Sequence, residues 1–256
     1  MAKITKSAAR MPREQSEVLR TAATATQSDT AVCKTAGQDV RSLSAKDVRR
    51  SGGILLDYQK RWINDSAPVK VIEKSRRIGV TWAEAIEDTL LAASANGDNV
   101  WYIGYNKDMA YEFIQTCAEW AKRWNKVSEA IKEDELIDED KKILSYSLTF
   151  ASGYRITALS SRPSNLRGKQ GKIVIDEAAF HEDLPELLKA ALAMLVWGGR
   201  VVIISTHNGE DNLFNELIKD IRAGRLKYSL HKVTFDDAIA DGLYEQVCKV
   251  TQKSGA

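Results

Sequence analysis

The stretch V-K-V-I-E-K-S-R-R-I-G-V-T, residues 69–81, decides how this chain is interpreted. A short β-branched run leads into a loop that holds one glycine, and residues with helical spacing follow. This order suits a phosphate-binding loop, because the first turn of a helix directs unpaired N–H groups and a positive dipole end at an anion. Against the Walker A pattern G-x-x-x-x-G-K-[ST], only Gly79 and Thr81 are in place, while Lys74 stands at the first glycine and Val80 at the lysine. Taken alone, the stretch leaves open an ordinary strand-to-helix turn with solvated cations.

The composition indicates a globular protein with an uneven charge distribution. The 256 residues are 44% hydrophobic and 28% charged, enough for a full core in one large or two small domains. Residues 1–50 carry ten Lys or Arg and five Asp or Glu, net +5, and the remaining 27 and 30 give net −3. A basic arm can contact nucleic acid or a partner, although a short basic tail is more often only solvated.

Cysteine usage and hydropathy indicate the compartment. Cys33, Cys117 and Cys248 are scattered without metal-ligand spacing, which suggests a reducing environment. No apolar run approaches the ~18 residues of a membrane span, and the first 20 residues lack a signal-peptide core. We therefore expect a soluble, cytoplasmic protein without membrane contact.

Strand and helix patterns alternate after residue 53 and predict an α/β domain with a mostly parallel sheet and one β-hairpin. Residues 1–50 have little to bury and are predicted to form a mobile basic arm, with the folded domain at 51–235. The acidic segment 133–140 is predicted to be a solvated connection. Strands are predicted at 69–72, 99–105, 142–150, 154–160, 172–176, 200–206 and 227–233, and helices at 82–90, 108–124, 184–196 and 213–221.

A pair of acids ends a second buried strand, K-I-V-I-D-E-A-A-F at 172–180. In open α/β sheets, ligands bind outside the carboxyl ends of the strands. There Asp176 could hold Mg²⁺ directly or through water, and Glu177 could polarise an attacking water. A plain polar strand end is the alternative, and the upstream loop disfavours it.

Two further segments carry polar residues suited to the same site. The strand I-I-S-T-H-N-G (203–209) could place Ser205 and Thr206 beside a phosphate, or end in simple capping hydroxyls. The loop 160–171 contains Arg162 and Arg167, which are solvated in the default interpretation and face phosphate or a neighbouring subunit in the other.

The segment 54–65 precedes the loop strand and could form a helical turn. Its bland interpretation is an amphipathic helix that packs on the sheet. In the sharper interpretation, the amide of Gln59 contacts an adenine edge beside the aromatic ring of Tyr58.

Together, K-S-R-R-I-G-V-T, V-I-D-E-A-A and I-S-T-H-N-G, with Gln59 upstream, resemble the ATPase domain of the large terminase subunit of tailed bacteriophages, with a Mu-like branch among the alternatives. The resemblance covers about residues 54–240 and implies a P-loop NTPase of the ASCE, RecA-like type. Residues 236–256 resemble the start of the family's linker to a nuclease domain, so we expect no nuclease activity from this chain.

The resemblance also implies roles for individual residues. Lys74 would be the phosphate lysine, Arg76 a finger in cis, Thr81 and Asp176 the Mg²⁺ site, and Glu177 the base. Ser205 and Thr206 would form the coupling motif, and Arg162 and Arg167 an arginine sensor or DNA contact. The implied ATP-binding residues are Tyr58, Gln59, Lys74, Ser75, Arg76, Arg77, Ile78, Gly79, Val80 and Thr81.

The expected function is Mg²⁺-dependent ATP hydrolysis that drives double-stranded DNA into a procapsid. ATP and Mg²⁺ are the expected cofactors, and sequence-independent DNA, a small terminase subunit, the portal or procapsid and a homo-oligomeric ring are the expected partners. The expected location is the host cytoplasm. Two alternatives stay open: a superfamily-two helicase core, and an ATP-binding assembly module that lost turnover through Val80.

Overall fold

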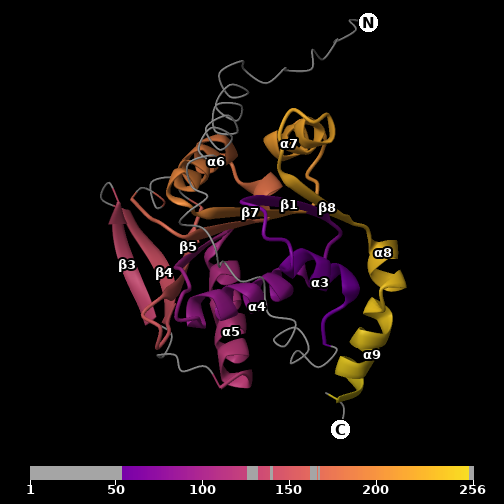
Figure 1. Ribbon diagram of the computed structural model, residues 1–256, viewed down its shortest axis with the longest axis horizontal. Helices are drawn as coiled ribbons and strands as arrows, with labels where there is room; N and C mark the ends of the chain where they lie inside the picture. Colours follow the sequence, from indigo (N-terminus) through magenta and orange to yellow (C-terminus); the bar gives the residue numbers. More distant parts are fainter. Residues whose placement is uncertain (1–53, 126–131, 139–140, 162–165, 167, 254–256) are drawn as a thin grey trace, which may run out of the picture.

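The computed structural model describes residues 54–125, 132–138, 141–161, 166 and 168–253. The predicted arm at 1–50, Arg162 and Arg167 lie outside the described residues. The described part forms a central sheet with helices on both faces (Figure 1). Its elements follow in the order α3 (Asp57–Ile63), β1 (Val69–Lys74), α4 (Val80–Ala93), β2 (Val100–Gly104), α5 (Lys107–Arg123), β3 (Lys132–Asp138), β4 (Lys141–Thr149), β5 (Arg155–Ser160), β6 (Lys172–Asp176), η3 (Ala178–Phe180), α6 (Leu184–Leu192), η4 (Ala193–Trp197), β7 (Arg200–Ser205), α7 (Leu213–Arg222), β8 (Ser229–Val233), α8 (Phe235–Ala240) and α9 (Leu243–Lys253).

The sheet has eight strands within the described residues, in the order β3-β4-β5-β2-β6-β7-β1-β8. All neighbours from β5 to β8 are parallel, whereas β4 runs antiparallel to β5 and β3 antiparallel to β4. The central strands are rich in Val and Ile and are buried, as expected for parallel strands covered by helices on both faces. The predicted mostly parallel α/β sheet with a hairpin is confirmed.

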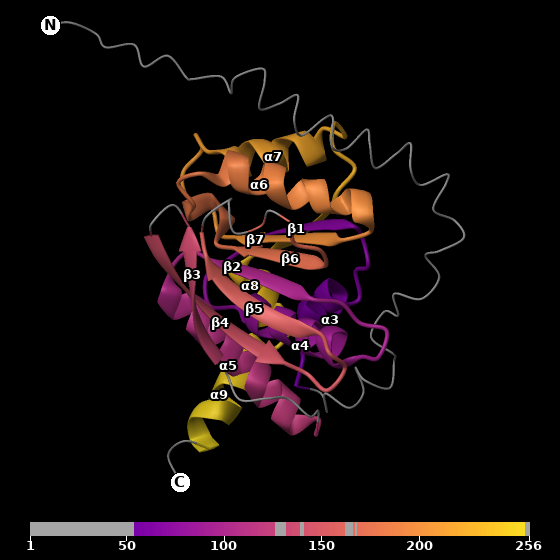
Figure 2. The same ribbon diagram turned by 90° about the vertical axis from the view of Figure 1, so that its left-hand side faces the viewer.

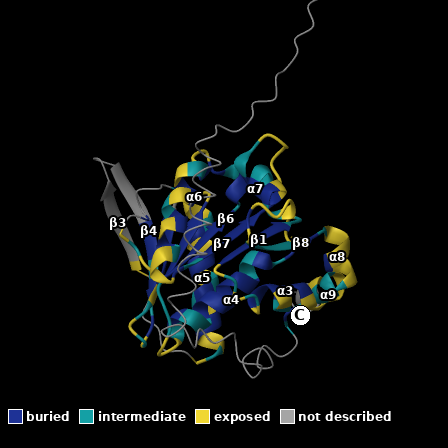
Figure 3. Ribbon diagram, turned by 45° about the horizontal axis from the view of Figure 1, so that its top comes forward, coloured by how far each residue is buried: buried dark blue, intermediate teal, exposed yellow. Residues whose placement is uncertain are grey.

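Two apolar cores lie on opposite faces of this sheet. Helices α3, α4 and α5 cover one face, and α6 and α7 cover the other (Figure 2). In β1, Ile72 belongs to the first core and Val71 to the second, because successive strand residues point to opposite faces. The buried residues gather in β6, β7 and β1, and the outer surfaces of the helices are exposed (Figure 3). The central strands are thus fixed from both sides.

The helices follow their sequence patterns closely. The side chain of Asn106 accepts a hydrogen bond from Met109 N and caps α5, whose buried residues recur with the predicted helical spacing. The predicted helix at 184–196 is interrupted, because α6 ends at Leu192 and the chain continues as the 3-10 turn η4 to Gly198. No helix in the described part of the chain combines the length and apolar character needed to cross a membrane.

The acidic segment is a correction to the sequence-based interpretation. Residues 132–138 form strand β3, which pairs with β4 from Lys132 opposite Ser147 to Asp138 opposite Lys141. The prediction of a solvated connection is wrong for these residues, and residues 139 and 140 lie outside the described part. An edge strand pairs on one side only and tolerates charged residues, so its charge resembled that of a loop.

The C-terminal helices α8 and α9 contact α3 and the residues that lead into it. The backbone N–H of Tyr58 donates to Asp241 Oδ2 at 2.9 Å, and Gln246 Nε2 donates to the carbonyl oxygen of Ile54 at 2.5 Å. Ala238 is fully buried in the core on the α3 side of the sheet. The segment predicted to begin a linker therefore packs against the folded domain, and its identity as a linker stays a prediction.

A group of charged side chains lies buried between α4 and the N-terminal ends of β1, β6 and β7. We call it the buried charge cluster, and its members are Lys70, Lys172, Arg200, Glu84, Glu87 and Asp88. Lys172 Nζ lies 2.6 Å from both Glu84 Oε1 and Asp88 Oδ1. Burial acts to lower the pKa of Lys172, but the neighbouring acids outweigh it and raise that pKa, so the amine stays charged. The cluster ties α4 to three strands.

Candidate active site

The loop between β1 and α4 has the backbone of an anion-binding turn. Arg77 (φ 56°) and Gly79 (φ 73°) adopt left-handed conformations, and α4 begins at Val80. A Cβ atom on Gly79 would lie 2.8 Å from Gln59 Nε2, so the close approach of that side chain and the positive φ both favour glycine. The N-terminus of α4 consequently faces the carboxyl edge of the sheet, with its N–H groups available to an anion.

Helix α3 supports this loop from behind. The hydroxyl of Tyr58 donates to the carbonyl oxygen of Ile78, and Gln59 Nε2 donates to that of Gly79 at 2.9 Å. Gln59 Oε1 accepts a hydrogen bond from Leu56 N at 2.9 Å, and the side chain is buried. Burial raises the pKa of Tyr58 to about 12, which keeps its hydroxyl a donor. Both ends of the Gln59 amide thus have partners within the chain, and the adenine contact stays a prediction.

The two acids at the end of β6 have separate partners. Thr81 Oγ1 donates to Asp176 Oδ2 at 2.8 Å, and Glu177 N donates to Asp176 Oδ1 at 2.9 Å. Burial raises the pKa of Asp176, and the charge of Lys74 is the main opposing influence. Glu177 has φ 49°, a left-handed conformation that turns its side chain away from the course of β6. The structure brings Thr81 and Asp176 together, and their role as a Mg²⁺ site stays a prediction.

Lys74 enters the site from the β1 side. Its Nζ atom lies 2.9 Å from Glu177 Oε1, and its side chain is only 6% exposed. Val80, at the pattern's lysine position, is buried in the apolar core on the α4 side. The ammonium group at the paired acids therefore comes from the first residue of the loop, and its role toward phosphate stays a prediction.

The strand β7 lies between β1 and β6, and the residues at its end contact the acid site. The backbone N–H and hydroxyl of Thr206 lie 3.3 Å from Glu177 Oε2 and donate to it. Ser205 is fully buried, accepts a hydrogen bond from Ala179 N and donates to the carbonyl oxygen of Thr206. Of the two predicted coupling residues, Thr206 contacts the acid and Ser205 fixes the turn after it.

The remaining loop residues differ in their surroundings. Arg76 is exposed and makes no hydrogen bond or ion pair with any residue that the structure describes, so its role as a finger stays a prediction. Ser75 N donates to the carbonyl oxygen of Val233 at 3.0 Å, which ties the loop to β8. Arg77 lines the cavity at the site. Arg162 and Arg167 lie outside the described residues.

The sequence analysis missed Tyr102 and His181, which contact Asp176, and the polar contacts of Glu73, which precedes Lys74 in β1. Tyr102 donates from its hydroxyl to Asp176 Oδ2 at 2.9 Å. His181 Nε2 lies 2.8 Å from the carbonyl oxygen of Asp176, and burial lowers the pKa of His181, so the ring is neutral and donates there. Glu73 Oε2 accepts from His207 Nε2 at 2.9 Å and its other oxygen pairs with Arg222. Only the strand 99–105 gave a signal, because its carboxyl end had to share an edge with that of β6.

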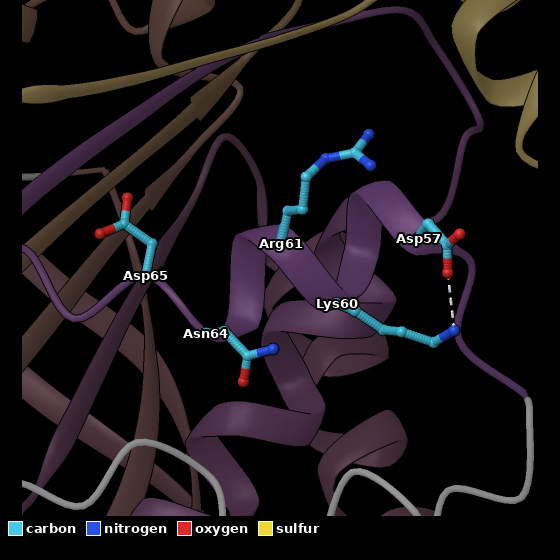
Figure 4. Close-up of a pocket in the computed structure, with 5 residues that line it drawn as sticks. All are labelled: Asp57, Lys60, Arg61, Asn64 and Asp65. Atoms are coloured by element: carbon cyan, nitrogen blue, oxygen red, sulfur yellow. Dashed lines mark hydrogen bonds and ion pairs between the residues drawn. The ribbon is translucent and has the colours of Figure 1, made fainter. Parts of the chain in front are cut away.

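The structure contains a cavity of about 290 Å³ at this edge. Its walls include loop residues, both acids and part of α5, namely Lys74, Arg77, Ile78, Gly79, Val80, Thr81, Trp82, Tyr102, Met109, Glu112, Phe113, Thr116, Asp176 and Glu177. A wider hollow of about 510 Å³ lies over α3, and Figure 4 shows its mixed charges, including the 2.7 Å ion pair between Lys60 and Asp57. None of the β1–α4 loop residues lines that hollow, and neither Asp176 nor Glu177 does, so the smaller cavity is the candidate site.

The donor set suits a hard divalent cation. Thr81 and Asp176 offer hydroxyl and carboxylate oxygens beside the cavity, the type of ligand that Mg²⁺ prefers. No group of three or more His, Cys, Asp and Glu in the described part of the chain could enclose a metal ion. Mg²⁺ is usually bound by one or two protein groups together with water and substrate phosphates. The residues present fit such an ion.

A glycine-bearing loop between a strand and a helix, with an acid-tipped strand separated from it by one other strand, defines the class of P-loop NTPases. The comparisons with known proteins agree with that class. The family model described as "Terminase large subunit, T4likevirus-type, N-terminal" matches residues 71–247. The chain therefore belongs to the terminase large subunit family, in the region that this model describes.

Two curated relatives resemble the chain closely in sequence. The Mu-like prophage FluMu protein gp28 of Haemophilus influenzae is 57% identical over 203 residues, covering 78% of this chain and 40% of the relative. The probable terminase, large subunit gp28, of Escherichia phage Mu is 53% identical over 211 residues, covering 80% and 38%. This chain spans about 40% of the length of these relatives.

Solved structures share the fold at low sequence identity. The large terminase ATPase domain of Thermus phage P74-26 has a TM-score of 0.56 and 18% identity, covering 79% of this chain and 90% of that one. The large terminase of another thermophilic bacteriophage, solved in complex with ADP, has a TM-score of 0.54 and 16% identity, covering 72% and 46%. These likenesses support the fold class.

Proposed function

We propose that this chain binds ATP with Mg²⁺ and hydrolyses it, as the nucleotide-driven part of a DNA-packaging terminase. The observation that carries the proposal is the convergence of Lys74, Glu177 and Thr206 beside the paired groups Thr81 and Asp176. Family membership supports it, as does the ADP complex of the thermophilic phage terminase, which shares the fold.

The contacts at the site indicate which side chains would change partners when a nucleotide binds. Phosphate oxygens would meet the N-terminus of α4 and the loop N–H groups. Lys74 would exchange its partner Glu177 for a phosphate oxygen, because the ammonium group and the anion then pair in the same cavity. Glu177 would keep Thr206 as a donor and gain a free carboxylate oxygen. Substrate binding thus releases the base.

The chemical step would use Glu177 as the general base. A carboxylate freed from Lys74 can accept a proton from a water held in line with the terminal phosphate. Thr81 and Asp176 would hold Mg²⁺, which supplies neutralising charge to the β- and γ-phosphates when bound. Arg76 is exposed in the loop and could turn toward charge on the departing phosphoryl group.

Hydrolysis measurements on paired variants test the proposal. Glu177→Gln should lower the hydrolysis rate about 10²- to 10⁴-fold while keeping ATP binding, because the amide has the size of the carboxylate but cannot take up the proton, and Lys74 pairs with phosphate in the bound state. Lys74→Ala should lower both binding and rate. The matched control is Lys60→Ala, which removes an exposed cation that pairs with Asp57 outside the cavity. Wild-type hydrolysis equal to that of Lys74→Ala would leave only the alternative of a binding module.

DNA, the small subunit, the portal and a homo-oligomeric ring are part of the same proposal. The net charge of residues 51–256 is slightly negative, so contacts with DNA must be local. We expect the isolated chain to bind double-stranded DNA weakly, with strong salt dependence and no sequence preference. Tight binding to one sequence at about 150 mM salt would contradict this. Strand separation on a forked duplex would instead favour the helicase alternative.

A further inference from the structure

Tyr102 is the buried group that approaches the acid site from β2. Its hydroxyl donates to Asp176 Oδ2 at 2.9 Å, the same oxygen that accepts from Thr81 at 2.8 Å. Asp176 Oδ1 accepts from Glu177 N at 2.9 Å. The Asp176 carboxylate therefore receives three hydrogen bonds. The donors Thr81 and Glu177 lie in α4 and directly after β6, whereas Tyr102 belongs to β2.

The ring of Tyr102 is held rigidly. It is 1% exposed and stacks on Phe113 of α5, with ring centroids 3.8 Å apart and an interplanar angle of 8°. Its backbone pairs with Val174 of β6, so its strand and that of Asp176 share one register. Tyr102 and Phe113 both line the cavity beside the acids. A donor fixed on two sides can determine the plane of the carboxylate that it contacts.

The hydrogen bond from Tyr102 to Asp176 affects cation binding because the same carboxylate oxygen accepts from the Thr81 hydroxyl. A hydroxyl that donates its single hydrogen to a carboxylate keeps its oxygen lone pairs for a metal ion. That arrangement requires the acceptor oxygen to stay in one place. Groups that orient metal-binding residues in this way commonly change metal affinity about 10- to 100-fold when removed.

We propose that Tyr102 is a positioning residue for the Mg²⁺ site: its hydroxyl fixes the Asp176 carboxylate so that Thr81 and Asp176 present their oxygens to the ion together. The proposal rests on the proposed function and adds a residue from β2 to it. Tyr102 acts only through Asp176.

The test is the variant Tyr102→Phe, which keeps the ring on Phe113 and removes the hydroxyl. Mn²⁺ serves as the paramagnetic probe, and its affinity is measured by electron paramagnetic resonance in the presence of ADP. Binding of a fluorescent ADP analogue is measured in parallel with and without chelator. We expect Mn²⁺ affinity to fall about 10-fold or more, and metal-free ADP binding to stay within about twofold of wild type.

The matched control is Tyr228→Phe, because the Tyr228 hydroxyl is also buried but has no hydrogen-bond partner in the described part of the chain. It should leave Mn²⁺ affinity unchanged. A second variant, Phe113→Leu, removes the stacked ring but keeps the Tyr102 hydroxyl, and should weaken Mn²⁺ binding less than Tyr102→Phe does.

The outcomes separate this inference from the function beneath it. If Tyr102→Phe binds Mn²⁺ as tightly as the wild-type protein does, and metal strengthens ADP binding to the wild-type protein, only the positioning role is overturned. Equal weakening of ADP binding with and without metal would overturn it too, because Tyr102 would then act as a wall of the cavity. If the wild-type protein binds ADP with the same affinity in the presence and absence of metal, the proposed Mg²⁺ site and the role of Tyr102 are both overturned.

Discussion

Helix α4 lies beside two sets of ionic contacts that differ in one respect. Near its first turn, Lys74 and Glu177 meet beside a cavity, and the Glu177 side chain is 23% exposed. Farther along, in the buried charge cluster, Lys172 and Glu84 meet with side-chain exposures of 1% and 0%. The first pair can exchange partners with an entering anion, whereas the second has no route to solvent. Under the proposed function, the charges near the first turn of α4 take part in chemistry, whereas those of the buried charge cluster hold the fold together.

The largest expected effect comes from breaking the buried set. Lys172→Met would leave Glu84, Glu87 and Asp88 without their shared cation, and should lower the free energy of unfolding by about 3–5 kcal/mol. Lys74→Met should change it by about 1 kcal/mol or less, because Glu177 keeps Thr206 and water as partners. Urea denaturation of both variants measures the difference. Similar losses would remove the distinction between the two sets.

A smaller effect should appear in the pH dependence of stability. Burial is the main reason that the pKa of Asp88 is raised to about 7, with Glu84 and Glu87 adding to it and Lys172 opposing. The native state then binds a proton more tightly than the unfolded state does, so the contribution of Asp88 is full below about pH 4 and is lost as pH rises through about 7. Asp88→Asn should remove that decline.

Urea denaturation of Asp88→Asn and wild type should be compared at about pH 5 and about pH 8. The stability of the variant relative to wild type should rise by more than about 1 kcal/mol over that interval. The pKa of Glu87 is lowered to about 2, so its contribution to stability is lost only as the pH falls below the unfolded value of 4.5. Glu87 therefore does not alter the comparison between about pH 5 and about pH 8. A difference that stays constant with pH would show that Asp88 is ionised throughout.

The smallest effect concerns the loop itself. Gly79→Ala should lower the free energy of unfolding by about 1 kcal/mol or somewhat more, because a Cβ combines a positive φ with a 2.8 Å approach to Gln59 Nε2. Gly198→Ala is the matched control, since it has φ 79° and nothing within 4 Å. In a double-mutant cycle, Gly79→Ala should cost less in the Gln59→Ala background than in the wild type, by the part of the loss that the contact causes. An equal cost in both backgrounds would assign the whole loss to backbone strain.

The sequence predicted the fold well where local pattern and burial agree. Strands of Val and Ile between helical segments predicted the parallel sheet. The loop and the acid strand predicted Thr81, Asp176 and Glu177 at one edge, and the resemblance added Lys74. Strand β3 was missed because its charges resemble those of a loop, while its stability comes from pairing with β4. Hydrogen bonds of that kind have no signature in the charge pattern.

The site was less predictable for a similar reason. Tyr102 reaches Asp176 only because β2 lies next to β6, a neighbourhood that spacing along the chain does not reveal. The same holds for Glu73, whose partner Arg222 is 149 positions away. The resemblance implies an adenine contact for Gln59, which stays a prediction, whereas the hydrogen bonds of its amide to Leu56 and Gly79 depend on the packing of α3 behind the loop.

The short helix α3 has a mechanical consequence. Tyr58 contacts the β1–α4 loop through its hydroxyl and Asp241 through its backbone N–H, so one residue joins the loop to the end of α8. A displacement of α8 and α9 would therefore be transmitted to the loop through Tyr58, without passing through the sheet. Such a connection acts in both directions. A movement of the loop would displace α8 and α9, just as a movement of these helices would displace the loop.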